Sequence, residues 1–496
     1  MEKFKSKSGF ILASIGAAVG LGNALRFPGL CAKYGGGAFL LIYLIALIVL
    51  GVPLLNAEIA MGRRFKSGAP RCTAGMLNRP NAAAVGWAAG LNSALTAVIY
   101  AGLAGWIIST AANITPLCLK SADMPRAEIS GYFFDCVLKS RNDGVIDGIS
   151  PVVLCCVVAA WVLMYFCLKG GAGSLAKAAK FTVIIPLVIL VLMAGRGLMY
   201  NNSGEALGAL FIPDFSCLNR PDMWLTALGQ VFFSLSVAVG IMPVYGSYLP
   251  EGAGIFGCSL AVAAADFLVS VLASVVLFTT LYGCGIQSAI CDSGILTAFA
   301  VYPVAITSLF GSNAVLNGVF GILFYCSLAM MAVQSAVSML EAFISPFADG
   351  DVKKKKKVVK IACLIGVAVS VLFSTSAAPL IIEVADLFIN FYNVLILCIA
   401  ECLILAFSKR TGGLVEEINK FSSRLKMPQK PFLISVKFLS PAILICLGVM
   451  EIFRIAGSPP GYPLWLITAF GAGLSVAVCA VSVVISMRRG RGGRPS

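Results

Sequence analysis

The chain of 496 residues contains no histidine and few charged residues. Without an imidazole, zinc sites of the HExxH type and nucleophiles that rely on a histidine base are excluded, so the chain is not expected to be an enzyme of these classes. Charged residues make up 12% of the sequence and hydrophobic residues 59%, with a mean hydropathy of +0.94. This composition is too apolar for a soluble fold, and it predicts a protein that crosses a membrane many times.

The 17 cysteines show no paired spacing of the kind that binds metals. Most lie inside apolar stretches, where a thiol behaves as a small apolar side chain. Five lie in or near the predicted outside loops, where a disulfide is an open possibility that the sequence cannot pair: Cys118, Cys136, Cys217, Cys284 and Cys291.

Apolar stretches long enough to cross a hydrocarbon layer of about 30 Å recur along the whole chain. They predict an all-α integral membrane protein with about 12 transmembrane helices. The first stretch is longer than a signal-peptide core and lacks a small-residue cleavage site, so we expect it to be retained. The predicted segments are 9–31, 37–61, 82–113, 150–168, 175–196, 222–248, 256–284, 313–345, 358–376, 381–407, 432–455 and 463–487.

Basic residues cluster in every second connection between these segments. By the positive-inside rule, both termini are cytoplasmic and the protein is expected in the plasma (cell inner) membrane as a multi-pass chain. The lysine run 353–357 could suggest nucleic acid, but its place between two spans favours the lipid bilayer as its partner, and we expect no nucleic acid. The clusters are Lys3 to Lys7, Arg63 to Arg71, Lys169 to Lys180, Lys353 to Lys357, Lys409 to Lys430 and Arg488 to Arg494.

The first segment contains a break in its helical pattern. Residues 16–28 read GAAVGLGNALRFP, which places several glycines, one asparagine and one arginine at membrane depth. Unwound backbone survives in a membrane only where an ion, a substrate or the protein itself satisfies the free peptide groups. The pattern therefore indicates a binding site. For Asn23 considered alone, an ordinary hydrogen bond between helices is the simpler interpretation.

The chain resembles the neurotransmitter:sodium symporter family, in particular its bacterial amino-acid:sodium symporters. The resemblance covers essentially the whole chain, and its most specific motifs are GLGNALRFP at 20–28, YGGGAF at 34–39, NAEIAMGRR at 56–64 and GQVFFSLS at 229–236. It implies a single domain with an inverted five-helix repeat, in which helices 1 and 6 are broken. The implied parts are a first repeat over 1–196, a second over 222–409 and two peripheral helices over 432–487.

The resemblance also implies one or two Na⁺ ions. The first site would be built from the break in helix 1 and from helices 6 and 7, by Ala18, Asn23, Ser234 and Asp266. The second would be built by Gly16, Val19, Met331, Gln334 and Ser335. Gln334 stands where related sequences usually carry threonine, so the geometry of this second site must differ.

The implied substrate site lies between the two breaks. Where family members that carry monoamines place an aspartate, this chain has Gly20, which leaves room for the carboxylate of an α-amino acid. The lining carries no formal charge, so the favoured substrate is a neutral, hydrophobic amino acid. Ala238 replaces a glycine that is common in the second break. The implied substrate-binding residues are Ala17, Ala18, Leu21, Gly22, Thr96, Tyr100, Phe233, Ser234, Ser236, Val239, Ser335 and Met339.

Asp266 is an acid in the middle of a predicted span and must have a partner there. One interpretation is a protonated acid that is hydrogen-bonded to a neighbour. The other follows from the family, in which chloride-dependent members carry asparagine at this position. A fixed carboxylate could replace the anion as a counter-charge for sodium, so we hypothesise chloride-independent transport. The matched chloride-site residues are Tyr43, Gln230, Ser234 and Ser270.

Alternating access requires gates on both sides of the site. The resemblance implies an outer pair of Arg26 and Asp386. It also implies an inner latch of Ser247, Tyr248 and Asp349, in which Phe4 replaces a common tryptophan and Lys3 or Lys5 supplies the charge. Glu58 and Glu401 would brace the second break. The expected function is sodium-coupled import of an amino acid. The alternatives are a sensor that does not transport and a channel, and these patterns leave the oligomeric state open.

Overall fold

The computed structural model describes residues 3–140, 144–291, 293–348, 351–422, 425–457 and 461–490. Ten helical spans in this part of the chain are long and apolar enough to cross a membrane. They are Gly37–Phe65, Pro80–Asp123, Pro151–Leu168, Gly171–Leu198, Ile255–Gly283, Ala314–Ala348, Val352–Ser374, Ala378–Phe407, Gln429–Gly457 and Leu464–Arg489. The main helices within these spans are α4 (Val52–Phe65), α6 (Ala83–Lys120), α8 (Pro151–Leu168), α9 (Gly171–Leu198), α13 (Ile255–Gly283), α16 (Ala314–Ala348), α17 (Val352–Ser370), α19 (Val394–Phe407), α22 (Ser440–Gly457) and α24 (Gly473–Gly490).

The first predicted span is a bent pair of helices. α1 (Lys7–Ala18) begins after the N-cap Ser6, whose hydroxyl accepts from the Gly9 N–H, and it ends where Val19 turns to an extended conformation. The chain becomes helical again in a π-type turn over Gly22–Arg26, followed by α2 (Phe27–Lys33). The two halves meet at an angle of 52°. The predicted break in helix 1 is confirmed.

The sixth predicted span is also broken. It consists of α11 (Pro221–Ser234) and α12 (Ile241–Ser247), and the residues between them are not helical. Within this connection, Ser236, Ala238 and Gly240 have φ of 53°, 62° and 78°. Positive φ is costly for residues other than glycine and occurs mostly where the surrounding structure enforces it, commonly at functional sites. With the bent pair of α1 and α2 counted as one span, the described part of the chain has up to 11 candidate spans, and α11 with α12 lies where the sixth of about twelve segments was predicted.

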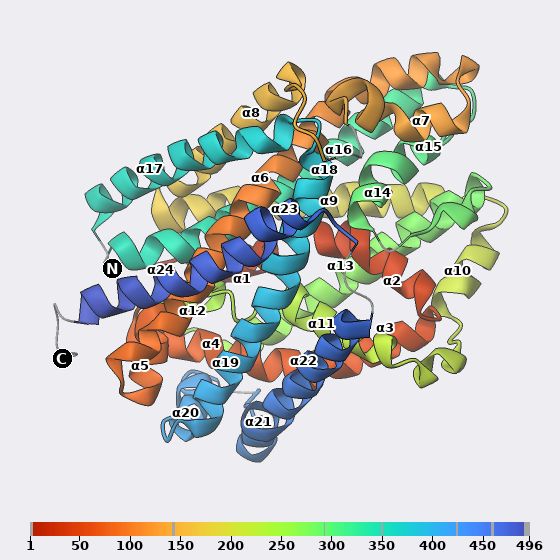
Figure 1. Cartoon of the computed structure of the whole chain (residues 1–496). Helices are drawn as coiled ribbons and strands as arrows, with labels where there is room; N and C mark the ends of the chain where they lie inside the picture. The colour runs from red at the N-terminus through yellow and green to blue at the C-terminus, as the bar shows by residue number, and fades with distance from the viewer. Residues whose placement is uncertain are drawn as a thin grey trace.

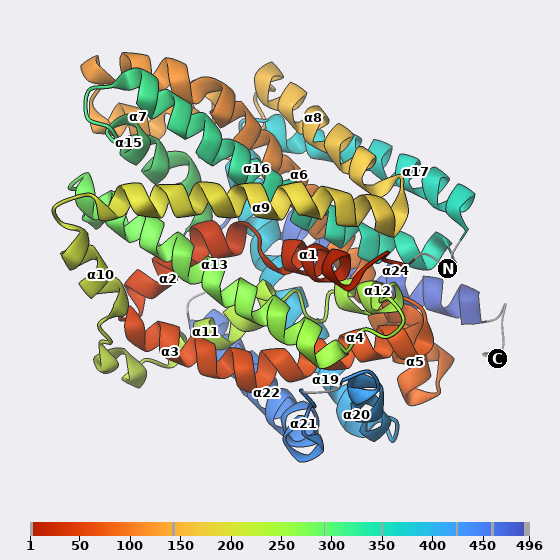
Figure 2. The same cartoon turned by 180° about the vertical axis from the view of Figure 1, so that it is seen from behind.

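The broken helices lie at the centre of the bundle (Figure 1). α1 packs against α9, α13 and α16, while α6 and α16 form the most extensive helix pair. From the opposite side, α9 lies across α1 and α13 (Figure 2). α12 and α4 approach each other backbone to backbone at two glycines. A Cβ on Gly62 would overlap the Pro243 carbonyl, and a Cβ on Gly246 would overlap the Ile59 carbonyl, so only glycine permits this contact.

Apolar side chains cover the outer face of the bundle. On α8 and α17, for example, Phe166 and Leu364 are 54% and 62% exposed, as expected for side chains in contact with lipid. The start of α1 and the end of α24 lie at the same end of the bundle as the start of α17 (Figures 1 and 2). All 17 cysteines, which lie in the described part of the chain, are free, so no disulfide joins the five near the outside loops.

Candidate functional site

The two breaks lie directly against each other. The Ser236 hydroxyl, in the connection between α11 and α12, donates to the carbonyl oxygen of Ala17 in α1 at 3.0 Å. Just beyond α1, the Asn23 side chain accepts from the Gly20 N–H at 3.0 Å and so closes the first break on itself. Two unwound segments that are more than 200 residues apart in sequence thus share one polar centre, which is what a binding site at membrane depth requires.

Asp266 on α13 is the acceptor at this polar centre. Its Oδ1 accepts from Asn23 Nδ2 at 2.8 Å and from the Ser234 hydroxyl at 2.6 Å, and its Oδ2 accepts from the Tyr43 hydroxyl at 2.8 Å. The Asn23 amide also donates to Ser270 Oγ at 2.8 Å. Asp266 is 0% exposed. The structure therefore brings Asn23, Ser234 and Asp266 together and supplies the partners that the buried acid needs.

Ala18 and Gln230, two further predicted site residues, are also buried. Ala18, the remaining residue of the first sodium site, is the last residue of α1 and is buried. The Gln230 side chain is 3% exposed, and its Nε2 has no hydrogen-bond partner in the described structure. A buried amide nitrogen without an acceptor is unusual, and it suits a bound group that accepts hydrogen bonds.

The residues of the second predicted sodium site lie where α16 meets the first break. A Cβ on Gly16 would lie 2.7 Å from Gln334 Cγ, and one on Gly20 would lie 2.7 Å from Ser335 Oγ. Val19 and Met331, the other two members, are 7% and 2% exposed. The Ser335 hydroxyl and Gln334 Nε2 are buried without a partner in the described part of the chain.

A small cavity of about 20 Å³ lies beside the second break. Five of the predicted substrate residues line it, together with Ser93, Phe232, Asn390 and Val394; the five are Thr96, Phe233, Ser236, Val239 and Met339. A much larger vestibule of about 640 Å³ is lined by Leu21, Gly22 and Tyr100, so these predicted residues face the entrance rather than the small cavity. Phe233 lines both spaces, as do Phe232, Asn390 and Val394.

Asn390 connects the small cavity to the vestibule and was missed by the sequence analysis. The Thr96 hydroxyl donates to Asn390 Oδ1 at 2.6 Å, and Asn390 Nδ2 donates to Asp386 Oδ1 at 2.7 Å. The available signal was the spacing of four, which places Asn390 one helical turn after Asp386. Arg26 and Asp386 both line the vestibule, and no ion pair joins these two described residues.

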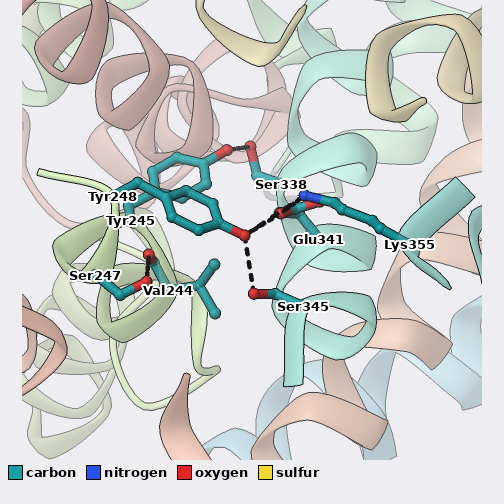
Figure 3. Close-up of polar contacts among 8 residues, drawn as sticks. All are labelled: Val244, Tyr245, Ser247, Tyr248, Ser338, Glu341, Ser345 and Lys355. Atoms are coloured by element: carbon teal, nitrogen blue, oxygen red, sulfur yellow. Dashed lines mark hydrogen bonds and ion pairs between the residues drawn. The ribbon is translucent and has the colours of Figure 1, made fainter. Parts of the chain in front are cut away.

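The opposite side of the site is closed by a cluster that we call the N-terminal latch, formed by Phe4, Tyr248, Glu341 and Lys355. Figure 3 shows Tyr248, Glu341 and Lys355 of this cluster. The Tyr248 hydroxyl donates to Glu341 Oε1 at 2.7 Å, and Lys355 Nζ pairs with the same oxygen at 2.6 Å. The side chains of Lys355 and Glu341 are 4% and 0% exposed. This buried ion pair and the Tyr248 hydrogen bond link the ends of α12, α16 and α17.

Phe4 completes the latch from the N-terminal segment. It is 2% exposed, its N–H donates to the Tyr248 carbonyl at 2.9 Å, and its ring packs edge-on against three aromatic rings, those of Phe10, Tyr245 and Tyr248. Ser247, which was predicted to belong to the latch, instead donates to the Val244 carbonyl of its own turn at 2.6 Å. Asp349 lies outside the described residues. Glu341 and Lys355 were not among the residues predicted from the sequence.

Lys3, rather than Lys5, supplies the charged contact of the N-terminal segment. Lys3 Nζ lies 2.5 Å from Glu251 Oε1 in the loop after α12. The hydrogen bond and the positive charge of Lys3 hold the pKa of Glu251 below its usual value. Both side chains are largely exposed, so this pair contributes little compared with the buried Phe4.

Glu58 on α4 braces the second break. Its Oε1 accepts from the Ala238 N–H at 2.8 Å and so satisfies a peptide group in the stretch of positive φ. Glu401 on α19 is also buried, at 8% exposure. Glu58 therefore contacts the break directly, whereas bracing by Glu401 stays a prediction.

Two facing breaks at membrane depth, an open vestibule on one side and a closed latch on the other define a membrane transporter of the broken-helix type. The chain belongs to the sodium:neurotransmitter symporter family, whose sequence model matches residues 1–117 and 121–489. This is a family of sodium-dependent transporters, which implies sodium as a co-transported ion.

Individual relatives extend over nearly the whole chain. An uncharacterised sodium-dependent transporter of Methanocaldococcus jannaschii is 30% identical over 493 residues, covering 98% of this chain and 97% of the relative. The sodium-dependent neutral amino acid transporter B(0)AT2 of Bos taurus is 24% identical, covering 93% and 74%. The crystal structure of MhsT in complex with L-phenylalanine matches with a TM-score of 0.75 and 25% identity, covering 90% and 99%. The expected fold class and family are thereby confirmed.

Proposed function

We propose that the chain imports a neutral, hydrophobic amino acid together with one or two sodium ions by alternating access. The observation that carries the proposal is the contact between the two breaks, where Asn23, Ser234 and Asp266 form one buried polar centre. The small cavity beside it contains no charged side chain among its lining residues, which favours an uncharged substrate side chain. The names of B(0)AT2 and of the MhsT complex support the same substrate class.

In the proposed mechanism, the first sodium ion is held by Ala18, Asn23, Ser234 and Asp266, and the substrate carboxylate completes its shell. In this mechanism Asp266 acts as a fixed negative charge, which the amide and two hydroxyls that donate to its oxygens would stabilise. A fixed charge at this point makes a bound chloride unnecessary. We therefore expect uptake to be unchanged when chloride is exchanged for gluconate. A collapse of uptake on this exchange would refute the role of Asp266.

Access alternates between the vestibule and the N-terminal latch. The described arrangement has the vestibule open, since Arg26 and Asp386 are apart, and the latch closed around Phe4. Closure of Phe233 over the small cavity and approach of Arg26 to Asp386 would shut the vestibule. Release of Phe4 would then open the other side. The helices of the two repeats, 1–196 and 222–409, would move relative to each other, with the latch facing the cytoplasm of the cell.

Purified protein in liposomes tests the proposal against its alternatives. With an inward sodium gradient, uptake of each of the twenty amino acids is measured, and a transporter accumulates its substrate only while the gradient lasts. A channel would let substrate equilibrate without accumulation. A sensor would bind amino acid with sodium in a thermal-shift or calorimetric assay but would show no uptake. Either of the last two results would refute the proposed function.

A further inference from the structure

Thr182 on α9 holds the side chain of Gln334 at the edge of the second candidate sodium site. Thr182 Oγ1 lies 3.0 Å from Gln334 Oε1 and 2.9 Å from the carbonyl oxygen of Ala178, one turn earlier in α9. Gln334 is 1% exposed, and its Cγ lies 2.7 Å from the position of a Cβ on Gly16. Helices α1, α9 and α16 therefore meet at this carboxamide.

The hydroxyl of Thr182 has a single hydrogen, so it donates to only one of the two oxygens at a time. When it donates to Gln334 Oε1, the buried Nε2 has no partner in the described structure, which is unfavourable. When it donates to Ala178, its oxygen is free to accept. A carboxamide turned by 180° about its last bond then donates from Nε2 to Thr182. Because the two ends of a carboxamide have nearly the same shape, this turn needs no extra space.

In the turned orientation, the Thr182 hydroxyl and one N–H of Gln334 each have an acceptor, and Gln334 Oε1 occupies the place of the unpartnered nitrogen. The neighbouring Ser335 hydroxyl, 2% exposed, also has no partner in the described part of the chain. It faces the first break, since its Oγ lies 2.7 Å from the position of a Cβ on Gly20. Two buried oxygens without donors, from Gln334 and Ser335, suit a cation that prefers oxygen ligands.

We propose that Thr182 is a positioning residue that accepts a hydrogen bond from Gln334 Nε2 and thereby directs Gln334 Oε1 toward the second sodium ion. This inference rests on the proposed function, because it takes sodium to bind at that site. It also explains how a glutamine serves where related sequences have threonine. The glutamine side chain is longer than threonine and has more conformational freedom. The hydrogen bond to the Thr182 hydroxyl on α9 restricts that freedom.

Sodium binding to the full-length protein in lipid nanodiscs tests this inference, with radioactive sodium as the probe and no amino acid present. Thr182→Val keeps the shape of the side chain and removes the hydroxyl. We expect about tenfold weaker sodium binding, at the lower end of the effect of removing the outer partner of a metal ligand. Thr182→Ser restores the wild-type affinity. Thr110→Val is the matched control, because the Thr110 hydroxyl donates to the Trp106 carbonyl one turn earlier in α6.

Gln334→Glu gives a second, independent readout. A carboxylate presents oxygen at both ends, so its sodium affinity no longer depends on an anchor for the nitrogen. Adding Thr182→Val to Gln334→Glu should therefore have no effect on sodium binding. Melting temperatures of all variants report whether they fold.

The possible results distinguish failure of the role of Thr182 from failure of the proposed function. Equal sodium affinities of the Thr182→Val and Thr110→Val proteins would overturn the role of Thr182 while leaving the proposed function intact. Tighter sodium binding by Thr182→Val would overturn it as well. That result would mean that, in the wild type, Thr182 holds Gln334 Oε1 and the amide nitrogen faces the site and repels the ion. Absence of sodium binding by the wild-type protein would overturn the proposed function together with this inference.

Discussion

Replacing Asp266 by asparagine removes one negative charge from the polar centre and leaves its shape unchanged. The carboxylate accepts from Asn23, Ser234 and Tyr43 at 2.6–2.8 Å, and it is fully buried. An asparagine has only one acceptor end, so at least one of these donors would face an NH₂ group. Breaking a buried charge pair by removing one partner costs about 3–5 kcal/mol. At the lower end of that range, sodium binds about 100-fold more weakly.

The assay is sodium-dependent uptake by proteoliposomes in chloride and in gluconate. We expect the half-saturating sodium concentration of Asp266→Asn to rise by about two orders of magnitude in gluconate and to fall again in chloride, because a mobile anion can take the place of the lost charge. Asp222→Asn is the control, since Asp222 is a half-exposed vestibule carboxylate paired with Arg220 at 2.8 Å. Equal sodium dependence of wild type and Asp266→Asn in gluconate would refute the counter-charge argument.

Three further predictions concern the lid, the second break and the latch. Phe233→Ala should raise the KM for a hydrophobic amino acid about tenfold or more, since burying one large apolar side chain is worth about 1.5–3 kcal/mol. Uptake kinetics measure this KM, and an unchanged KM would show that Phe233 is no lid. Ala238→Gly should raise the melting temperature, because alanine at φ 62° costs about 1–2 kcal/mol; a lower melting temperature would contradict the strain. Lys355→Met should leave Glu341 buried without its cation and speed hydrogen exchange of the N-terminal segment, and adding Glu341→Gln should slow it again.

The positions of the spans were predictable from the sequence, because hydrocarbon admits only apolar stretches of a defined length. The segment 256–284, for example, corresponds to α13 (Ile255–Gly283) within one residue at each end. Helix ends outside the hydrocarbon were less predictable. The third segment was expected to end at 113, whereas α6 continues to Lys120. Hydropathy reports the thickness of the membrane, and it does not report where a helix stops beyond it.

The first break was predictable for a related reason, since glycine and asparagine in the middle of a span signal backbone that needs other partners, whereas the second break was expected from the family resemblance. The buried ion pair of the latch was not predicted. Lys355 stands in a run of five lysines, which by composition marks only a membrane surface. Burial shows that it shares one helix face with Val359 and Cys363, at spacings of four. That face could have been found by helical periodicity, but its partner Glu341 is fixed by the packing of α16 against α17.

Under the proposed function, the chain of hydrogen bonds from Thr96 through Asn390 to Asp386 links the occupancy of the small cavity to the vestibule gate. A substrate side chain that fills the cavity contacts Thr96 and Asn390 directly, because both line it. The Asn390 amide holds Asp386 at 2.7 Å, so we expect a shift of Asn390 caused at Thr96 to reach the carboxylate that Arg26 must approach. The vestibule can then close on a filled site more readily than on an empty one, which is the requirement for coupled rather than leaky transport.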